Sequence, residues 1–168
     1  MLEKVLSKNS CAECRFCCSF RRQSLWELPR LPLEFAERYQ AGFDGEPVKY
    51  IIEENAGMKY AITDLTGKYL TDDPEEEVRC PFLDPSKGCF LPEADKPFEC
   101  SMWPLRYMEM PDGGQKISLT PTCPAINRVP LDEMKELARG DAGKKIRKYA
   151  ETHPYIIKDH VQGFEVLE

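Results

Sequence analysis

Cysteine is the residue type that offers distinctive chemistry in this sequence, because the chain of 168 residues contains eight of them. Thiolates bind metal ions and iron–sulfur clusters, and thiols form disulfides. Four cysteines lie close together near the start of the chain and four are spread over residues 80–123. All eight are candidate metal ligands: Cys11, Cys14, Cys17, Cys18, Cys80, Cys89, Cys100 and Cys123.

The first cluster has the spacing Cys-x-x-Cys-x-x-Cys-Cys. Each Cys-x-x-Cys step places two sulfurs on one tight turn, and bacterial ferredoxins begin their [4Fe–4S] binding run with three cysteines at this spacing. Cys18 follows Cys17 directly, and the side chains of adjacent residues point in different directions. We therefore expect Cys17 and Cys18 to bind two different metal centres, or one of them to bind a metal while the other packs against the protein. A distant cysteine must then complete the site.

Three interpretations compete for the cysteines. The N-terminus has neither the apolar core nor the cleavage site of a secretory signal, and no apolar run approaches the roughly 20 residues that span a bilayer. We therefore expect a cytoplasmic protein without membrane contact, where thiols stay reduced, and this disfavours a scaffold of four disulfides. An iron–sulfur cluster, [4Fe–4S] first, is favoured by the three-cysteine run and by the lack of histidine nearby. Zinc bound by cysteines is the alternative cofactor.

Charge and motifs exclude several classes of function. Lysine and arginine number 23 and aspartate and glutamate 29, which gives a net charge of 23 − 29 = −6, so a broad basic face for nucleic acid is not expected. No catalytic triad, phosphate-binding loop or dinucleotide fingerprint is present. The sequence names no catalytic residue and leaves open whether the chain is an enzyme. A protein partner in a redox or modification system is the expected kind of partner.

Residues beside the cysteines allow two interpretations each. The neighbouring arginines could stabilise thiolate charge or could be ordinary surface residues: Arg15, Arg21, Arg22 and Arg79. The neighbouring aromatic residues could shield a cluster from water or could simply pack in the core: Phe16, Phe20, Phe82, Phe90, Phe98 and Trp103. The acidic run over residues 72–77 is typical of a solvated loop, and His153 and His160 are not expected to be ligands.

Local patterns predict a mixed α+β fold. A helix is expected over residues 33–41, strands over 47–53 and 58–64, and a hairpin from 105–110 and 115–120. Helices are expected over residues 130–139 and 142–152, the second capped by Asp141, and a closing strand over 163–168. We expect one domain over residues 1–168, with a Cys11–Cys123 core and residues 130–152 as a helical C-terminal extension. Short strands and loops would gather around the metal, with helices outside.

The order of the cysteines resembles that of a known family. The cysteine cluster is followed by Cys80-Pro-Phe-Leu-Asp, Gly88-Cys-Phe, Lys96-Pro-Phe-Glu-Cys and Pro104. Over Cys11–Cys123 this pattern is similar to that of the CxxCxxCC family of zinc- or iron-chelating cysteine-cluster proteins. Lys96 stands where the family usually has arginine, and lysine lacks the planar fork that binds anions through two hydrogen bonds.

The resemblance implies metal binding. Its relatives include the flagellin lysine-N-methylases, which share the cysteine cluster, so it also implies an iron–sulfur-dependent protein lysine methylase-like enzyme as an alternative. Three hypotheses therefore stand. They are one or two iron–sulfur clusters used in electron transfer or a redox or modification system, a zinc-stabilised protein-interaction module that uses the 130–152 helices, and the methylase-like enzyme.

Overall fold

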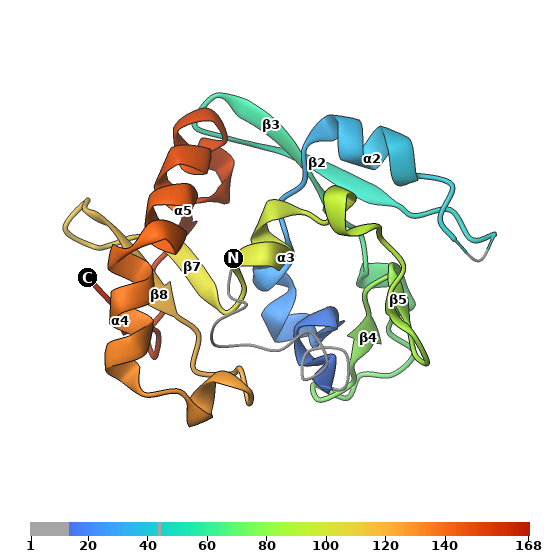
Figure 1. Ribbon diagram of the computed structural model, residues 1–168. Helices are drawn as coiled ribbons and strands as arrows, with labels where there is room; N and C mark the ends of the chain where they lie inside the picture. Colours follow the sequence, from blue (N-terminus) through green and yellow to red (C-terminus); the bar gives the residue numbers. More distant parts are fainter. Residues whose placement is uncertain (1–13, 44) are drawn as a thin grey trace. The chain divides into compact units, whose positions relative to one another are not determined.

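The computed structural model describes residues 14–43 and 45–168 as a mixture of short helices and antiparallel sheets, which confirms the α+β class (Figure 1). Its contacts divide the chain into two compact units. The N-terminal unit is Arg15–Pro97, and the C-terminal unit is Phe98–Glu168, to which Cys14 also belongs. The prediction of one domain over residues 1–168 stays a prediction. Within the described residues, no helix has the length and apolar character needed to cross a membrane.

The N-terminal unit consists of many short elements. In chain order they are η1 (Phe16–Cys18), β1 (Ser19–Phe20), η2 (Arg22–Glu27), α2 (Leu33–Tyr39), β2 (Tyr50–Asn55), β3 (Met58–Thr63), η3 (Thr66–Lys68), β4 (Val78–Arg79), β5 (Leu83–Asp84), β6 (Gly88–Cys89) and η4 (Glu93–Asp95), where η marks a 3-10 helix. Three separate two-stranded sheets pair β1 with β4, β2 with β3 and β5 with β6. The unit therefore has no extended sheet in its described part.

The β2–β3 hairpin confirms the two predicted strands. Asn55 pairs with Met58, and the two residues between them, Ala56 and Gly57, have φ angles of 50° and 75°. Positive φ at both central residues is the signature of a type I′ turn, whose twist matches that of the strands. Glycine adopts this conformation freely, whereas the alanine adopts it at a conformational cost.

Two small clusters belong to the apolar core of the N-terminal unit, which also contains the buried Tyr60, Phe82, Leu83 and Leu91. One contains Phe20, Leu28 and Leu65, and the other contains Leu31, Ala36 and Ala61. The second cluster joins α2 to β3, and Leu31 exchanges backbone hydrogen bonds of 2.8 Å with Ala61. The helix α2 begins at Leu33 as predicted and ends at Tyr39, two residues before the predicted end.

The C-terminal unit has longer and more regular elements. In chain order they are α3 (Phe98–Met102), β7 (Leu105–Glu109), β8 (Gln115–Leu119), η5 (Ile126–Arg128), α4 (Leu131–Arg139), α5 (Asp141–Thr152), η6 (Pro154–Ile156), β9 (Lys158–Asp159) and β10 (Glu165–Val166). One four-stranded sheet has the order β10-β8-β7-β9, in which β9 is parallel to β7 and the other pairs are antiparallel. The predicted hairpin, the two helices and the closing strand are all confirmed.

The prediction that Asp141 caps α5 is wrong. Asp141 is the first residue of the helix, Gly140 occupies the cap position, and the cap makes no side-chain hydrogen bond. An acidic residue in the first turn still suits the positive end of the helix dipole. The helices α4 and α5 contact each other, and a Cβ atom at Gly143 would lie 1.6 Å from the backbone oxygen of Ala138, so only glycine fits there.

Candidate functional site

Four of the predicted ligands belong to the N-terminal unit. Cys17 and Cys18 end η1, Cys80 directly follows β4, and Cys89 ends β6. Cys100, in α3, and Cys123, before η5, belong to the C-terminal unit, as does the exposed Cys14. Cys11 lies outside the described residues. No disulfide joins any of the seven described cysteines.

A backbone ladder between β1 and β4 brings the N-terminal cysteine cluster into contact with the cysteines of residues 80–123. Ser19 of β1 pairs with Arg79 of β4, and one residue further along, the N–H of Cys80 donates a 2.8 Å hydrogen bond to the carbonyl oxygen of Cys18. The two cysteines are therefore opposite each other at the end of a short antiparallel pair. In this way β1 and β4 bring the end of the sequence cluster to the start of the dispersed set, although 61 residues lie between Cys18 and Cys80.

A tight turn brings Cys89 back towards Cys80. The N–H of Leu83 donates to the carbonyl oxygen of Cys80 at 3.0 Å, and Leu83 then pairs with Cys89 across the β5–β6 ladder. Between the two strands, one carboxylate oxygen of Asp84 accepts hydrogen bonds from the backbone N–H groups of Ser86 and Lys87 at 2.6 and 3.0 Å. Asp84 thus closes the turn that sets the spacing between Cys80 and Cys89.

The thiol of Cys80 has a strongly perturbed pKa. Its pKa is raised to about 12, mainly because the thiol is desolvated; a hydrogen bond from the backbone N–H of Phe82 lowers the pKa, and charge on Cys89 and Cys17 raises it. These charge effects mean that the sulfurs of Cys17 and Cys89 lie within electrostatic range of Cys80. At neutral pH a buried thiol in this setting stays protonated unless a cation compensates its charge.

The described side chains do not form a finished metal site. Within residues 14–43 and 45–168, no group of three or more His, Cys, Asp or Glu side chains is arranged to hold a metal ion. What the fold provides is a gathering of Cys17, Cys18, Cys80 and Cys89 on adjoining turns of one unit. The predictions of metal binding and of its eight ligands stay predictions.

The acidic run that we interpreted as a solvated loop binds the two arginines that follow β1. Arg21 pairs with Glu75 at 3.1 Å and with Glu77 at 2.9 Å, and Arg22 pairs with Glu76 at 3.7 Å. Both arginines follow the cysteine cluster in the sequence. Because carboxylates bind them, their observed role is to join two segments of the chain.

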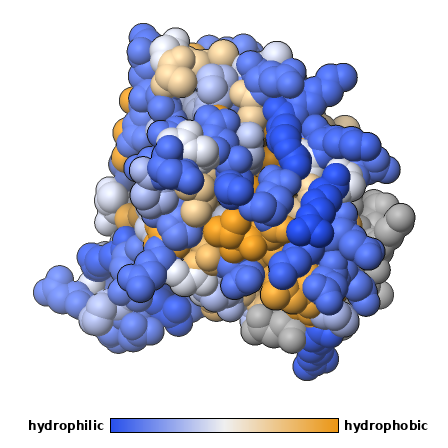
Figure 2. Space-filling view, turned by 90° about the vertical axis from the view of Figure 1, so that its left-hand side faces the viewer, coloured by the Kyte–Doolittle hydropathy of each residue, from blue (hydrophilic) through white to orange (hydrophobic). Residues whose placement is uncertain are grey.

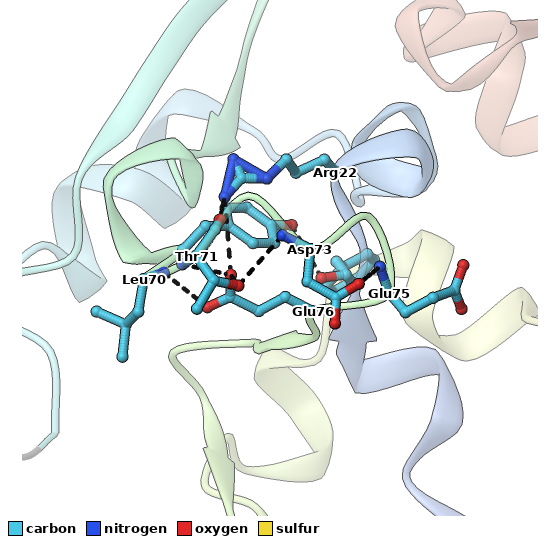
Figure 3. A network of polar contacts seen from close by, with 8 residues as sticks. Arg22, Leu70, Thr71, Asp73, Glu75 and Glu76 are labelled. Atoms are coloured by element: carbon cyan, nitrogen blue, oxygen red, sulfur yellow. Dashed lines mark hydrogen bonds and ion pairs between the residues drawn. The ribbon is translucent and has the colours of Figure 1, made fainter.

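Glu76 is the centre of this contact (Figure 3). Its carboxylate accepts hydrogen bonds from the backbone N–H groups of Leu70 at 2.6 Å and Thr71 at 2.9 Å, and these two bonds are the main reason that its pKa is lowered. Arg22 donates to the carbonyl oxygen of Thr71 and stacks on the ring of Tyr69, 4.5 Å from its centre. We call the contacts among Arg21, Arg22 and residues 69–77 the arginine clamp.

The arginine clamp reaches β1 through Tyr69, whose hydroxyl donates a 2.9 Å hydrogen bond to the carbonyl oxygen of Phe20. Phe20 pairs with Val78 in the ladder that ends at Cys18 and Cys80. The clamp therefore fixes both strands that carry the two cysteines. Sequence reasoning missed this role, although an acidic run and an arginine pair that each lie within ten residues of a cysteine were a usable signal.

The aromatic residues beside the cysteines pack as core and surface clusters. Phe82 is buried and contacts Phe35 edge-on at 5.5 Å, and Phe90 stacks on Phe43 at 5.1 Å. In the C-terminal unit, Phe98 stacks on Tyr149 at 3.9 Å. Packing therefore accounts for these rings, and Phe82 and Phe90 also flank the turn between Cys80 and Cys89.

The C-terminal unit holds a buried ion pair that the sequence did not signal. Lys158 of β9 and Glu99 of α3 are 2% and 1% exposed, and their charged atoms lie 3.2 Å apart. Glu99 lies between Phe98 and Cys100, and Lys158 lies between Ile157 and Asp159, so no sequence pattern connected the two residues. A buried pair of this kind is costly to desolvate and costly to break.

Comparison of the chain with the profiles of known protein families, with curated proteins and with solved structures found no match. The resemblance in cysteine order therefore remains an expectation.

Proposed function

We propose that the chain is a metal-binding protein that holds an iron–sulfur cluster, with [4Fe–4S] as the first choice, through its cysteines. The observation that carries this proposal is the backbone hydrogen bond that joins Cys18 and Cys80 at the end of the β1–β4 ladder, and the electrostatic influence of Cys17 and Cys89 on the half-buried Cys80 supports it. Cysteines that are far apart in sequence rarely gather on adjoining turns of a reduced protein unless they bind something.

The proposed ligands fall into two sets. Cys80, Cys89 and one of the adjacent pair Cys17 and Cys18 are the first set, because side chains at adjacent positions diverge. The remaining cysteines, Cys11, Cys14, Cys100 and Cys123, are candidates for a second centre. The short strands and loops of the N-terminal unit would then surround the metal.

The residues around Cys80 suit a thiolate-bound centre. A cation would compensate the charge that burial otherwise disfavours on this sulfur, and the N–H of Phe82 already donates a hydrogen bond to it. Hydrogen bonds to ligand sulfurs and exclusion of water are the two protein features that tune the potential of an iron–sulfur cluster. When bound, such a cluster supplies one-electron transfer. The partner would then be a redox protein in the same reducing compartment.

Zinc is the second candidate, because four sulfurs in one unit match the commonest structural zinc site. The chain would then be an interaction module, and the basic face of α5 would be its contact surface. Lys144, Lys145 and Lys148 are all exposed on this helix. Figure 2 shows that the face on the side of α4 and α5 is mainly hydrophilic, with hydrophobic side chains gathered near its middle.

The test is elemental analysis of iron, zinc and acid-labile sulfide on protein purified without oxygen. We expect brown protein with iron and sulfide in equal amounts, and we expect Cys80→Ser to lose most of both. Val161→Ser is the control, because Val161 is exposed and is not among the proposed ligands. Colourless protein with stoichiometric zinc would replace the iron–sulfur proposal by the zinc one. Protein that carries neither metal would contradict both.

A further inference from the structure

The β2–β3 hairpin presents an unusual strand edge. Among the residues that the structure describes, β2 pairs with β3 and with no other strand. Ile51 and Ile52 in the middle of β2 are 40% and 52% exposed. Since successive side chains of a strand point to opposite faces, apolar surface lies on both sides of this edge. Proteins normally protect an apolar edge strand, because it is a template for pairing with another strand.

The backbone of β2 is in register to accept another strand. The N–H of Asp64 donates a 2.8 Å hydrogen bond to the carbonyl oxygen of Lys49, which makes this a hydrogen-bonded pair of the antiparallel ladder. Such pairs alternate with pairs that are not bonded, so Ile51 and Glu53 bond to β3. Tyr50 and Ile52 therefore direct their N–H and carbonyl groups to the outer edge.

We propose that the outer edge of β2 is a homodimerisation surface, where the β2 strands of two copies pair antiparallel about a two-fold axis at Ile51. This arrangement places Ile51 opposite Ile51 of the partner subunit and Tyr50 opposite Ile52 of the partner subunit. The residues whose backbone groups point outwards then face each other, as an antiparallel ladder requires. This inference is independent of the metal and goes beyond the proposed function.

Charge complementarity favours a second copy of the chain as the strand that pairs with the outer edge of β2. It also favours the register with the two-fold axis at Ile51. With the axis at Ile51, Lys49 lies opposite Glu53 of the partner subunit, and the symmetry creates this pair twice. Opposite charges at directly facing positions stabilise a strand pair. An axis at Ile52 would instead place Lys49 opposite Asn55 of the partner subunit and Ile51 opposite Glu53 of the partner subunit, which loses both complementary contacts.

Sedimentation equilibrium of the full chain tests the proposal over about 1 µM to about 1 mM, the range of weak and moderate dimers. We expect the mass to rise from 19.3 kDa towards twice that value. Lys49→Glu turns two attractive pairs into repulsive ones and should weaken the dimer at least about tenfold. The double variant Lys49→Glu/Glu53→Lys exchanges the charges and should restore dimerisation. Lys59→Glu on β3 is the control, since Lys59 is exposed and does not lie on the outer edge.

Amide hydrogen exchange gives a second measurement that needs no variant. The N–H groups of Tyr50 and Ile52 should become protected as protein concentration rises, while those of Ile51 and Glu53 should be protected at every concentration by their bonds to β3. The proposal is overturned if the chain is monomeric throughout the range. It is equally overturned if Lys49→Glu leaves the dimer unchanged, or if protection of Ile52 does not depend on concentration because another segment covers the edge.

Discussion

The N-terminal and C-terminal units bury their residues in different ways. The C-terminal unit has a four-stranded sheet and two regular helices, and many of its side chains are fully buried, among them Leu105, Met108, Ile117 and Ile146. The described part of the N-terminal unit has three two-stranded sheets, and fewer of its apolar side chains are buried. Two-stranded sheets are marginal by themselves, and small cores supply little stability.

The difference indicates what each unit needs in order to fold. Burial of apolar surface can stabilise the C-terminal unit, whereas the N-terminal unit depends on cross-links between its short segments. The arginine clamp and the aromatic packing around Phe82 are two such links. The proposed metal would be a third and the strongest, because the free energy of metal binding becomes folding free energy when the ligands lie on loops.

Removal of the metal is expected to have the largest effect and to act on one unit. The chain has two tryptophans, Trp26 in the N-terminal unit and Trp103 in the C-terminal unit. Trp103→Phe leaves Trp26 as the fluorescent reporter, and Trp26→Phe leaves Trp103. Chelation should shift the emission of Trp26 and lower the melting temperature that it reports, while Trp103 should change little. Equal changes at both tryptophans would show that the two units share the metal's stabilising effect.

Disruption of the buried ion pair between Lys158 and Glu99 is expected to destabilise the C-terminal unit more than the N-terminal unit, because both residues belong to the C-terminal unit. Lys158→Met leaves Glu99 charged and buried without its cation, and breaking such a pair typically costs about 3 to 5 kcal/mol. Denaturant unfolding followed by Trp103 measures this loss, and Trp26 should report a smaller change. Lys144→Met is the matched control, because Lys144 is exposed and pairs with the exposed Asp141 at 4.0 Å. If Lys158→Met is as mild as the control, the pair does not stabilise this unit.

The same contrast separates what the sequence predicted from what it did not. Both hairpins and both C-terminal helices follow local patterns of turn residues and apolar spacing, so they were predictable. The cap of α5 was not, because Gly140 and Asp141 both suit a helix start and only the backbone decides between them. The approach of Cys18 to Cys80 depends on pairing between segments about 60 residues apart, which local patterns do not encode.

Loss of the Glu76 charge in the arginine clamp is expected to have the smallest effect on stability. It tests whether this loop stabilises the N-terminal unit alone. The pKa of Glu76 is lowered in the folded chain because the N–H groups of Leu70 and Thr71, and then Arg22, stabilise its carboxylate. A lowered pKa means that the stabilisation is complete above the ordinary glutamate pKa of 4.5 and is lost as pH falls through the folded value. Glu76→Gln should therefore lower the melting temperature reported by Trp26 near neutral pH.

The difference between Glu76→Gln and the wild type should close in acid, since both then carry an uncharged side chain at this position. Asp72→Asn, in the same acidic run, is the control for loss of one negative charge from the loop. A difference that persists after the pH has fallen well below the lowered pKa of folded Glu76 would mean that the shape of Glu76, and not its charge, holds the clamp. An effect on Trp103 equal to that on Trp26 would show that the clamp stabilises both units, and the contrast between them would then not extend to this loop.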